Sequence, residues 1–186
     1  MTGSLKLIVA GVLLTAVMPA MAAPPACPAL LDHAFPRLQD EASQSLCQYA
    51  GKVLLVVNTA SYCGHTNQYD GLERLYRKYG ERGLVVIGFP SNDFNQEPGE
   101  NAEITDFCRT TYGVQFPMFA RSTVSGPQAN PFYLKLAELS GERPRWNFHK
   151  YLVDRSGARV TSFPTQVSPE SPILVSAIER LLDARP

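Results

Sequence analysis

The sequence lacks a surplus of charge of either sign and has few cysteines. Lysine and arginine together number 17, as do aspartate and glutamate, so the formal net charge is zero. Nucleic-acid binding depends on clustered, unneutralised lysine and arginine, so this balance argues against a nucleic-acid partner. Four cysteines are too few for a disulfide-dense miniprotein but suffice for one disulfide and one redox pair.

The chain also lacks internal repeats, low-complexity tracts and any linker that would divide it. Hydrophobic residues make up 45% of the 186 positions and charged residues only 18%. This composition provides enough apolar surface for a packed core and excludes a disordered polymer. The length fits a single domain.

The first 22 residues have the pattern of a secretory signal peptide. Lys6 precedes an apolar run at 7–18, and small residues follow up to Ala22. The run is shorter than the ~20 apolar residues of a membrane-spanning helix. We expect cleavage after Ala22, which leaves one domain at 23–186 in an exported, periplasmic or secreted protein without membrane contact. An uncleaved anchor is the alternative.

Export would place Cys27 and Cys47 in an oxidising compartment. The segment between them has no long hydrophobic periodicity and is expected to form a strand or hairpin that needs a covalent cross-link to hold it in place. A disulfide closing a loop of this size stabilises a protein by about 3 kcal/mol on the chain-entropy estimate. We therefore expect a structural disulfide. Two free thiols are the alternative for a cytosolic protein, and a lipid attached at Cys27 is disfavoured by its distance from the apolar run.

Two apolar runs, at 52–57 and 84–89, are typical of strands buried on both faces. Tyr69, Leu72, Leu75, Tyr76 and Tyr79 recur between them at helical spacing. A right-handed crossover through this helix makes the two strands parallel.

Further elements follow in a defined order. We expect a polar loop at 90–101, a helix ending at Gly113, a short strand at 116–119, a helix from Asn130, a hairpin across 150–163 and a last helix from Ser171. The order fits an α/β protein, a three-layer thioredoxin-like sandwich with an insertion. Sites of open α/β sheets lie at the carboxyl ends of the strands, where the turn at Cys63 and the loop at 90–101 emerge.

Cys63 lies between the end of a strand and the start of a helix. Free backbone N–H groups and the positive end of the helix dipole favour a thiolate there. The turn reads Cys-Gly-His-Thr, without the second cysteine of a disulfide oxidoreductase. A single activated thiolate suits attack on a peroxide oxygen, which gives a sulfenic acid. An inert buried cysteine is the alternative.

His65 raises the question of a metal, because it lies two residues after Cys63. Cys-x-His supplies only two ligands, whereas a structural zinc site takes four. We expect neither a metal nor a cofactor. His33 and His149 carry no distinct signal and are expected to be structural.

Three separated motifs resemble the glutathione peroxidase family. They are the stretch from NTASYCGHT to QEPGEN, the segment WNFHKYLVDRSG, and SPES near the end, and the likeness runs from about Gly51 to Leu182. The resemblance implies a thioredoxin-like fold and the reduction of hydrogen peroxide or organic hydroperoxides to water or alcohols.

By position, Cys63 matches the peroxidatic residue of that family, and Gln96, Trp146 and Asn147 match the rest of its catalytic tetrad. Neutral amide and indole N–H donors are suited to stabilising a thiolate and polarising a peroxide. Without the resemblance, Trp146 would be taken as core packing and the two amides as turn residues. The loop before Gln96 is one residue shorter than is usual in the family.

Cys108 matches the resolving cysteine of the thioredoxin-dependent members. It shares an apolar helical face with Ile104 and Phe107, so a buried core cysteine is the alternative. A disulfide requires Cα atoms within about 7 Å, so the helix must loosen before Cys108 meets Cys63. The resemblance implies a thioredoxin-type reductant, with glutathione as the alternative.

The chain lacks the longer insertion of the tetrameric members before Trp146, which implies a monomer. Two other functions compete with a peroxidase. An exported thiol–disulfide exchange protein is disfavoured by the missing Cys-x-x-Cys, and a binding module without activity is disfavoured by the complete tetrad.

Overall fold

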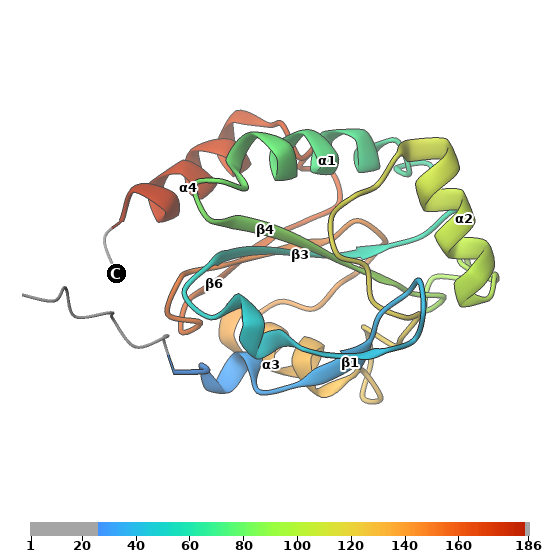
Figure 1. Cartoon of the computed structure of the whole chain (residues 1–186), viewed down its shortest axis with the longest axis horizontal. Coiled ribbons are helices and arrows are strands. Elements are labelled where there is room, and N and C mark those ends of the chain that lie inside the picture. Colours follow the sequence, from blue (N-terminus) through green and yellow to red (C-terminus); the bar gives the residue numbers. More distant parts are fainter. Residues whose placement is uncertain (1–25, 185–186) are drawn as a thin grey trace, which may run out of the picture.

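The computed structural model describes residues 26–184, and the predicted signal peptide at 1–22 lies outside them. A four-stranded sheet lies between layers of helices (Figure 1). No helix of the described residues is long and apolar enough to span a bilayer. The α/β class predicted from the sequence is confirmed.

The sheet has the strand order β4-β3-β5-β6. β3 (Val53–Thr59) and β4 (Leu84–Pro90) are parallel and are joined by α1 (Gln68–Tyr79), so the predicted β-α-β unit is confirmed. On the other side of β3, β5 (Lys150–Val153) and β6 (Val160–Phe163) form the predicted antiparallel hairpin. β3 is therefore a central strand, between β4 and β5.

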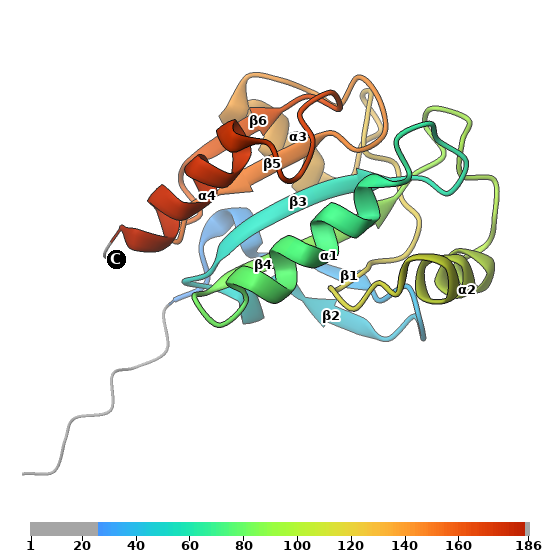
Figure 2. The same ribbon diagram turned by 90° about the horizontal axis from the view of Figure 1, so that it is seen from above.

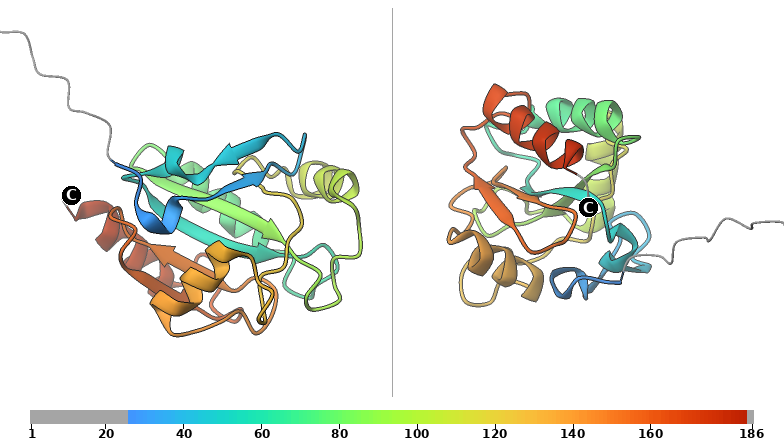
Figure 3. Two further views of the ribbon diagram at one scale, coloured as in Figure 1. Left: turned by 90° about the horizontal axis from the view of Figure 1, so that it is seen from below. Right: turned by 90° about the vertical axis from the view of Figure 1, so that its left-hand side faces the viewer.

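The two faces of the sheet carry separate cores. Odd-numbered residues of β3 lie in the core with α1 and α4 (Pro172–Asp183), and even-numbered residues lie in the core with α3 (Pro131–Ser140). The end-on view in Figure 3 shows these layers above and below the sheet. Since both faces are covered, β3 is buried along its whole length, as its unbroken apolar run predicts.

Helix α2 (Asn101–Tyr112) is placed differently from the other helices. It lies beyond the end of the sheet where β3 and β4 finish (Figure 2). Gly113 ends it in the left-handed conformation, with φ +60°, as the sequence predicts.

The prediction of a short strand at 116–119 is wrong. The segment forms only two isolated bridges, from Met118 to Gly88 and from Phe119 to Arg37. Pro117 has no N–H to donate, so the pairing does not extend into a ladder.

The N-terminal segment forms a hairpin of its own. β1 (Ala34–Pro36) pairs with β2 (Ser43–Ser45), between the short 3₁₀ turns η1 (Ala29–Leu31) and η2 (Leu46–Tyr49). A disulfide joins Cys27 to Cys47, with 5.1 Å between their Cα atoms. The disulfide expected from the sequence thus joins the two ends of this hairpin segment, which lies on the same face of the sheet as α3, as the left view of Figure 3 shows.

Candidate active site

Cys63 lies in the turn between the end of β3 and the start of α1. Its side chain is 8% exposed, and its Sγ accepts a hydrogen bond from the His65 N–H at 3.4 Å. The Thr66 hydroxyl fixes the turn, because it accepts from the Cys63 N–H at 3.1 Å and donates to the Cys63 carbonyl at 2.6 Å. The sulfur therefore meets a backbone N–H in the turn that leads into α1.

The turn Trp146–Phe148 lies one residue before β5 and is fixed by Asn58 of β3. The Asn58 carbonyl accepts from the Phe148 N–H at 2.6 Å, and its Nδ2 donates to the Trp146 carbonyl at 3.1 Å. Phe148 has φ +60°, a conformation that a bulky residue adopts only where its surroundings hold it.

Trp146 is not a core residue. Its side chain is 41% exposed, and its ring lies 5.5 Å from that of Phe94 in the loop after β4. An indole N–H at the surface of the site is available to a ligand.

Gln96 and Asn147 meet at this site from opposite sides of β3, because Gln96 lies in the loop after β4 and Asn147 lies before β5. Asn147 is fully buried, and its Nδ2 donates to Gln96 Oε1 at 2.9 Å. The Gln96 carbonyl accepts from the Tyr62 N–H at 3.1 Å, which ties its loop to the turn of Cys63. The shorter loop therefore still brings Gln96 to Asn147 and beside the cysteine turn.

Glu97 reinforces this tie and was not expected from the sequence. Its Oε2 accepts from the Ser61 N–H at 2.8 Å and from the Ser61 hydroxyl at 3.0 Å. Burial raises the pKa of Glu97, and the bonds from Ser61 oppose that shift. The carboxylate thus holds the loop of Gln96 to the turn of Cys63.

Thr165 and Gln68 close the site from the far side and were also not expected. The Thr165 hydroxyl donates to the Asn147 carbonyl at 2.7 Å, and Gln68 Nε2 donates to the Thr165 carbonyl at 2.8 Å. Gln68 is the first residue of α1, directly after the turn of Cys63. A closed series of hydrogen bonds therefore leads from Gln68 through Thr165 and Asn147 to Gln96, and the bond from Tyr62 to Gln96 returns it to the turn of Cys63. Nothing in the pattern of hydrophobic residues marks these two polar side chains as buried.

Cys108 lies on α2 and takes no part in this series of hydrogen bonds. It is buried, and its Sγ donates to the Tyr69 hydroxyl at 3.4 Å. Burial raises the pKa of Cys108 to about 11. Cys63 and Cys108 belong to the same apolar core, and both are free thiols.

The histidines are part of the surrounding structure. His149 Nε2 lies 2.9 Å from the Ser162 hydroxyl, and burial lowers the pKa of His149 to about 4. His33 packs against Phe132, and His65 Nδ1 lies 3.5 Å from Gln68 Nε2.

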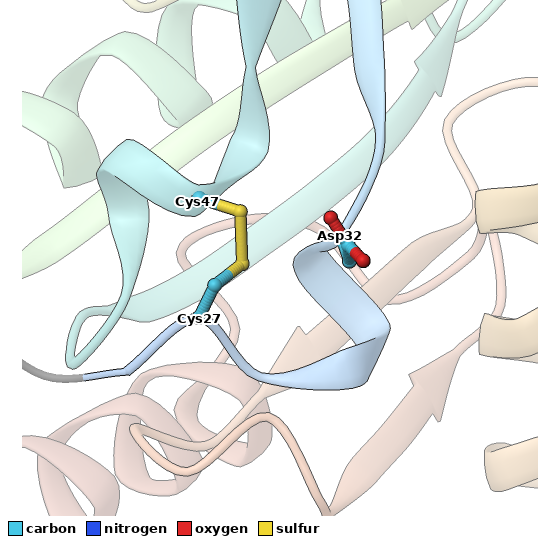
Figure 4. Close-up of side chains that lie close together, drawn as sticks. All are labelled: Cys27, Asp32 and Cys47. Atoms are coloured by element: carbon cyan, nitrogen blue, oxygen red, sulfur yellow. A yellow bond between two sulfur atoms is a disulfide. The ribbon is translucent and has the colours of Figure 1, made fainter.

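One group of side chains with ligand chemistry gathers at the hairpin. Cys27, Asp32 and Cys47 lie close together in Figure 4. Because the two sulfurs are joined as a disulfide, neither offers the thiolate that binds a metal. Within residues 26–184 this group holds no set of three free ligands.

The profile of the family described as glutathione peroxidase matches residues 33–137. A hydroperoxy fatty acid reductase from Synechocystis sp. is 44% identical over 154 residues, which cover 77% of this chain and 90% of that protein. A glutathione peroxidase-like peroxiredoxin from Schizosaccharomyces pombe is 50% identical over 125 residues, which cover 64% and 79%. The crystal structure of apo Trgpx has a TM-score of 0.67 at 31% identity and covers 86% of this chain and 98% of that one. The thioredoxin-like fold predicted from the sequence is confirmed.

Proposed function

The chain belongs to the glutathione peroxidase family and is a peroxidase, and we propose that Cys63 reduces hydroperoxides and is regenerated through Cys108 by a thioredoxin-type protein. The observation that carries the proposal is the hydrogen bond between Asn147 and Gln96 beside the turn of Cys63. It gathers three of the four tetrad positions from segments far apart in the chain.

In the first step, the Cys63 thiolate attacks one oxygen of the hydroperoxide. The S–O bond forms as the O–O bond breaks, Cys63 becomes a sulfenic acid, and the leaving oxygen takes a proton to become an alcohol or water. Gln96 accepts from Asn147 through its Oε1, which leaves its own Nε2 N–H groups to donate. Together with the indole N–H of Trp146, these donors would stabilise the developing charge.

In the second step, the Cys108 thiol attacks the sulfenic sulfur. A Cys63–Cys108 disulfide forms, and the hydroxyl of the sulfenic acid leaves as water with the thiol proton. This step requires α2 to open. Two features support opening: α2 buries only Ile104 and Cys108, and a cavity of about 270 Å³ is lined by residues of both α2 and the turn of Cys63.

In the third step, a thioredoxin-type dithiol reduces the disulfide and is itself oxidised. The name of the Schizosaccharomyces pombe relative describes that protein as a glutathione peroxidase-like peroxiredoxin, and the free thiol of Cys108 in the core of Cys63 supports a dithiol reductant for this chain. The test is turnover of hydrogen peroxide with thioredoxin and its reductase against glutathione, run side by side. Faster turnover with glutathione would contradict the proposed reductant.

The substrate class is proposed to include fatty acid hydroperoxides, as the name of the Synechocystis relative suggests. A groove of about 640 Å³ beside Trp146 is lined by Arg143 and Arg145, whose guanidinium groups suit a carboxylate. We expect a lower KM for a fatty acid hydroperoxide than for its methyl ester. Equal KM values would contradict the carboxylate contact.

Export of the protein is part of the proposal, and the Cys27–Cys47 disulfide supports it, since such bonds persist in oxidising compartments. Fractionation of cells that express the full chain tests this, and a reduced, cytosolic protein would contradict it. A monomer is proposed as well, and the mass measured by light scattering checks it.

A further inference from the structure

Lys150, the first residue of β5, is a lysine in a fully buried position. Its Nζ donates to the Phe148 carbonyl and to the Val167 carbonyl, both at 2.7 Å. Within the described part of the chain it forms no salt bridge, and burial is the cause that lowers its pKa to about 7. A buried cation without a counter-ion is unfavourable unless it is hydrogen-bonded, so this position calls for an explanation.

The two carbonyls belong to the two turns that hold Asn147. Phe148 follows Asn147 directly and has the unusual φ of +60°. Val167 ends the turn that begins at Pro164, in which the Thr165 hydroxyl donates to the Asn147 carbonyl. Lys150 and Thr165 therefore join the same two turns through separate hydrogen bonds, one at the Asn147 carbonyl and one at the next carbonyl, that of Phe148.

We propose that Lys150 is a positioning residue for peroxide reduction: its ammonium clamps the turn 146–148 to the turn 164–167 and so fixes the direction of the Asn147 amide. This inference rests on the proposed function of Cys63. Lys150 touches neither the thiol nor the peroxide and acts through Asn147, whose Nδ2 meets Gln96 at 2.9 Å. A displacement of about 1 Å in such a group lowers a rate by up to ~100-fold.

The clamp loses its charge as the pH rises through the pKa of Lys150. Other ionisable groups on the surrounding elements are His65 and Tyr69 near the start of α1, His149 on the approach to β5, and Glu170 beyond the turn 164–167. Burial keeps His149 neutral above its pKa of about 4, and it raises the pKa of Tyr69. Arg74 lowers the pKa of Glu170, which stays charged.

The test compares two reactions of the same thiolate in Lys150→Met, which keeps the length of the side chain and removes its donors. Single-turnover oxidation of Cys63 by hydrogen peroxide depends on the positioned amides, whereas alkylation by iodoacetamide depends chiefly on the thiolate fraction. We expect oxidation to slow about 10-fold and alkylation to change by less than about 2-fold. The matched control is Lys52→Met, at an exposed lysine before β3, which should change neither rate.

Equal rates of oxidation in Lys150→Met and wild type would overturn the inference, as would an equal fall of both reactions. The second measurement needs no variant: in wild type, the ratio of the oxidation rate to the alkylation rate should fall above about pH 7. A ratio that stays flat to pH 10 would overturn the inference, and Lys150→Arg, which keeps its charge, should remove the fall. If wild-type Cys63 does not react with peroxide at all, the proposed function fails instead.

Discussion

Cys63 and Cys108 share one apolar core, yet the segments that carry them are held differently. Helix α1, which follows Cys63, buries seven of its twelve residues, whereas α2, which carries Cys108, buries two of twelve. The turn of Cys63 is also tied by side-chain hydrogen bonds to the loop of Gln96 and, through Gln68, to Thr165. The proposed peroxide reduction at Cys63 would thus take place on a rigid frame.

Helix α2 has cavities on two sides. One of about 330 Å³ lies between α2 and the segment 114–118, and the other is lined by residues of α2 and of the turn of Cys63. Elements with few buried apolar contacts open at a fraction of the free energy of global unfolding. The proposed function divides its two chemical steps between these two parts of the molecule: oxidation needs fixed donors, and resolution needs a helix that moves.

The largest effect is expected from Cys63→Ser, which removes the nucleophile from the rigid region. A serine hydroxyl stays protonated at neutral pH and is a far weaker nucleophile than a thiolate, so we expect peroxide reduction to fall at least about 1,000-fold. A peroxide-consumption assay measures this, with the circular dichroism spectrum as the control for folding. Turnover above a few per cent of wild type would contradict the role of Cys63.

Cys108→Ser should affect the step proposed for α2 and leave the step at Cys63 nearly unchanged. The first oxidation of Cys63 should stay within about 2-fold of wild type, whereas thioredoxin-supported cycling should fall about 100-fold and sulfinic acid should accumulate at Cys63. Stopped-flow oxidation, coupled turnover and mass spectrometry report these three quantities. If the variant cycles normally with thioredoxin, Cys108 is a core residue and the resolving role is wrong.

The pH dependence of stability should reveal how tightly α2 is closed. The folded-state pKa of Cys108, about 11, is above its ordinary value of 9.0, so the native state holds the thiol proton more strongly. This stabilisation is fully present below pH 9 and is lost as the pH rises towards 11, by up to about 2 kcal/mol. Urea unfolding at pH 8 and pH 10.5 measures it, and Cys108→Val should show a smaller loss. Equal losses of stability in wild type and in Cys108→Val would contradict the burial of the Cys108 thiol under a closed α2.

The smallest effect is expected from loosening α2 itself. Glu103 closes the capping box at the start of the helix, where its side chain accepts from the Glu100 N–H at 3.0 Å. Glu103→Ala should weaken the cap by about 1 kcal/mol and raise the open population about 5-fold. Disulfide formation after peroxide should then accelerate while the first oxidation does not.

The matched control is Glu138→Ala on α3, where the glutamate pairs with Lys135 at the surface. It should change neither step. A slower disulfide step in Glu103→Ala would show that resolution does not depend on opening of α2.

The sequence predicted the parts of the protein that follow from periodicity and turn chemistry. Apolar runs marked β3 and β4, and Asn130 marked the start of α3, where its Oδ1 accepts from the Tyr133 N–H. The strand expected at 116–119 is not formed, because Pro117 has no backbone N–H to donate to a ladder of hydrogen bonds. The pattern of apolar residues that predicted the strand takes no account of this missing donor. Cys63 was marked by its turn, whereas Gln96 and Asn147 depended on a resemblance.

The residues that support the site were not predicted, for a common physical reason. Glu97, Lys150 and Thr165 are buried polar side chains, and a polar residue in a sequence is usually read as exposed. Their burial is stabilised by partners distant in the chain, such as Ser61 for Glu97 and Val167 for Lys150. Lys150, directly before the apolar run at 151–153 of a predicted strand, was the available signal.

The most direct test of the account is a peptide map of the wild-type protein after one equivalent of hydroperoxide, with free thiols blocked before digestion. We predict a peptide pair joined by a Cys63–Cys108 disulfide, beside an unchanged Cys27–Cys47 pair. A sulfenic or sulfinic acid at Cys63 with Cys108 alkylated only after unfolding would contradict it, since α2 would then have stayed closed.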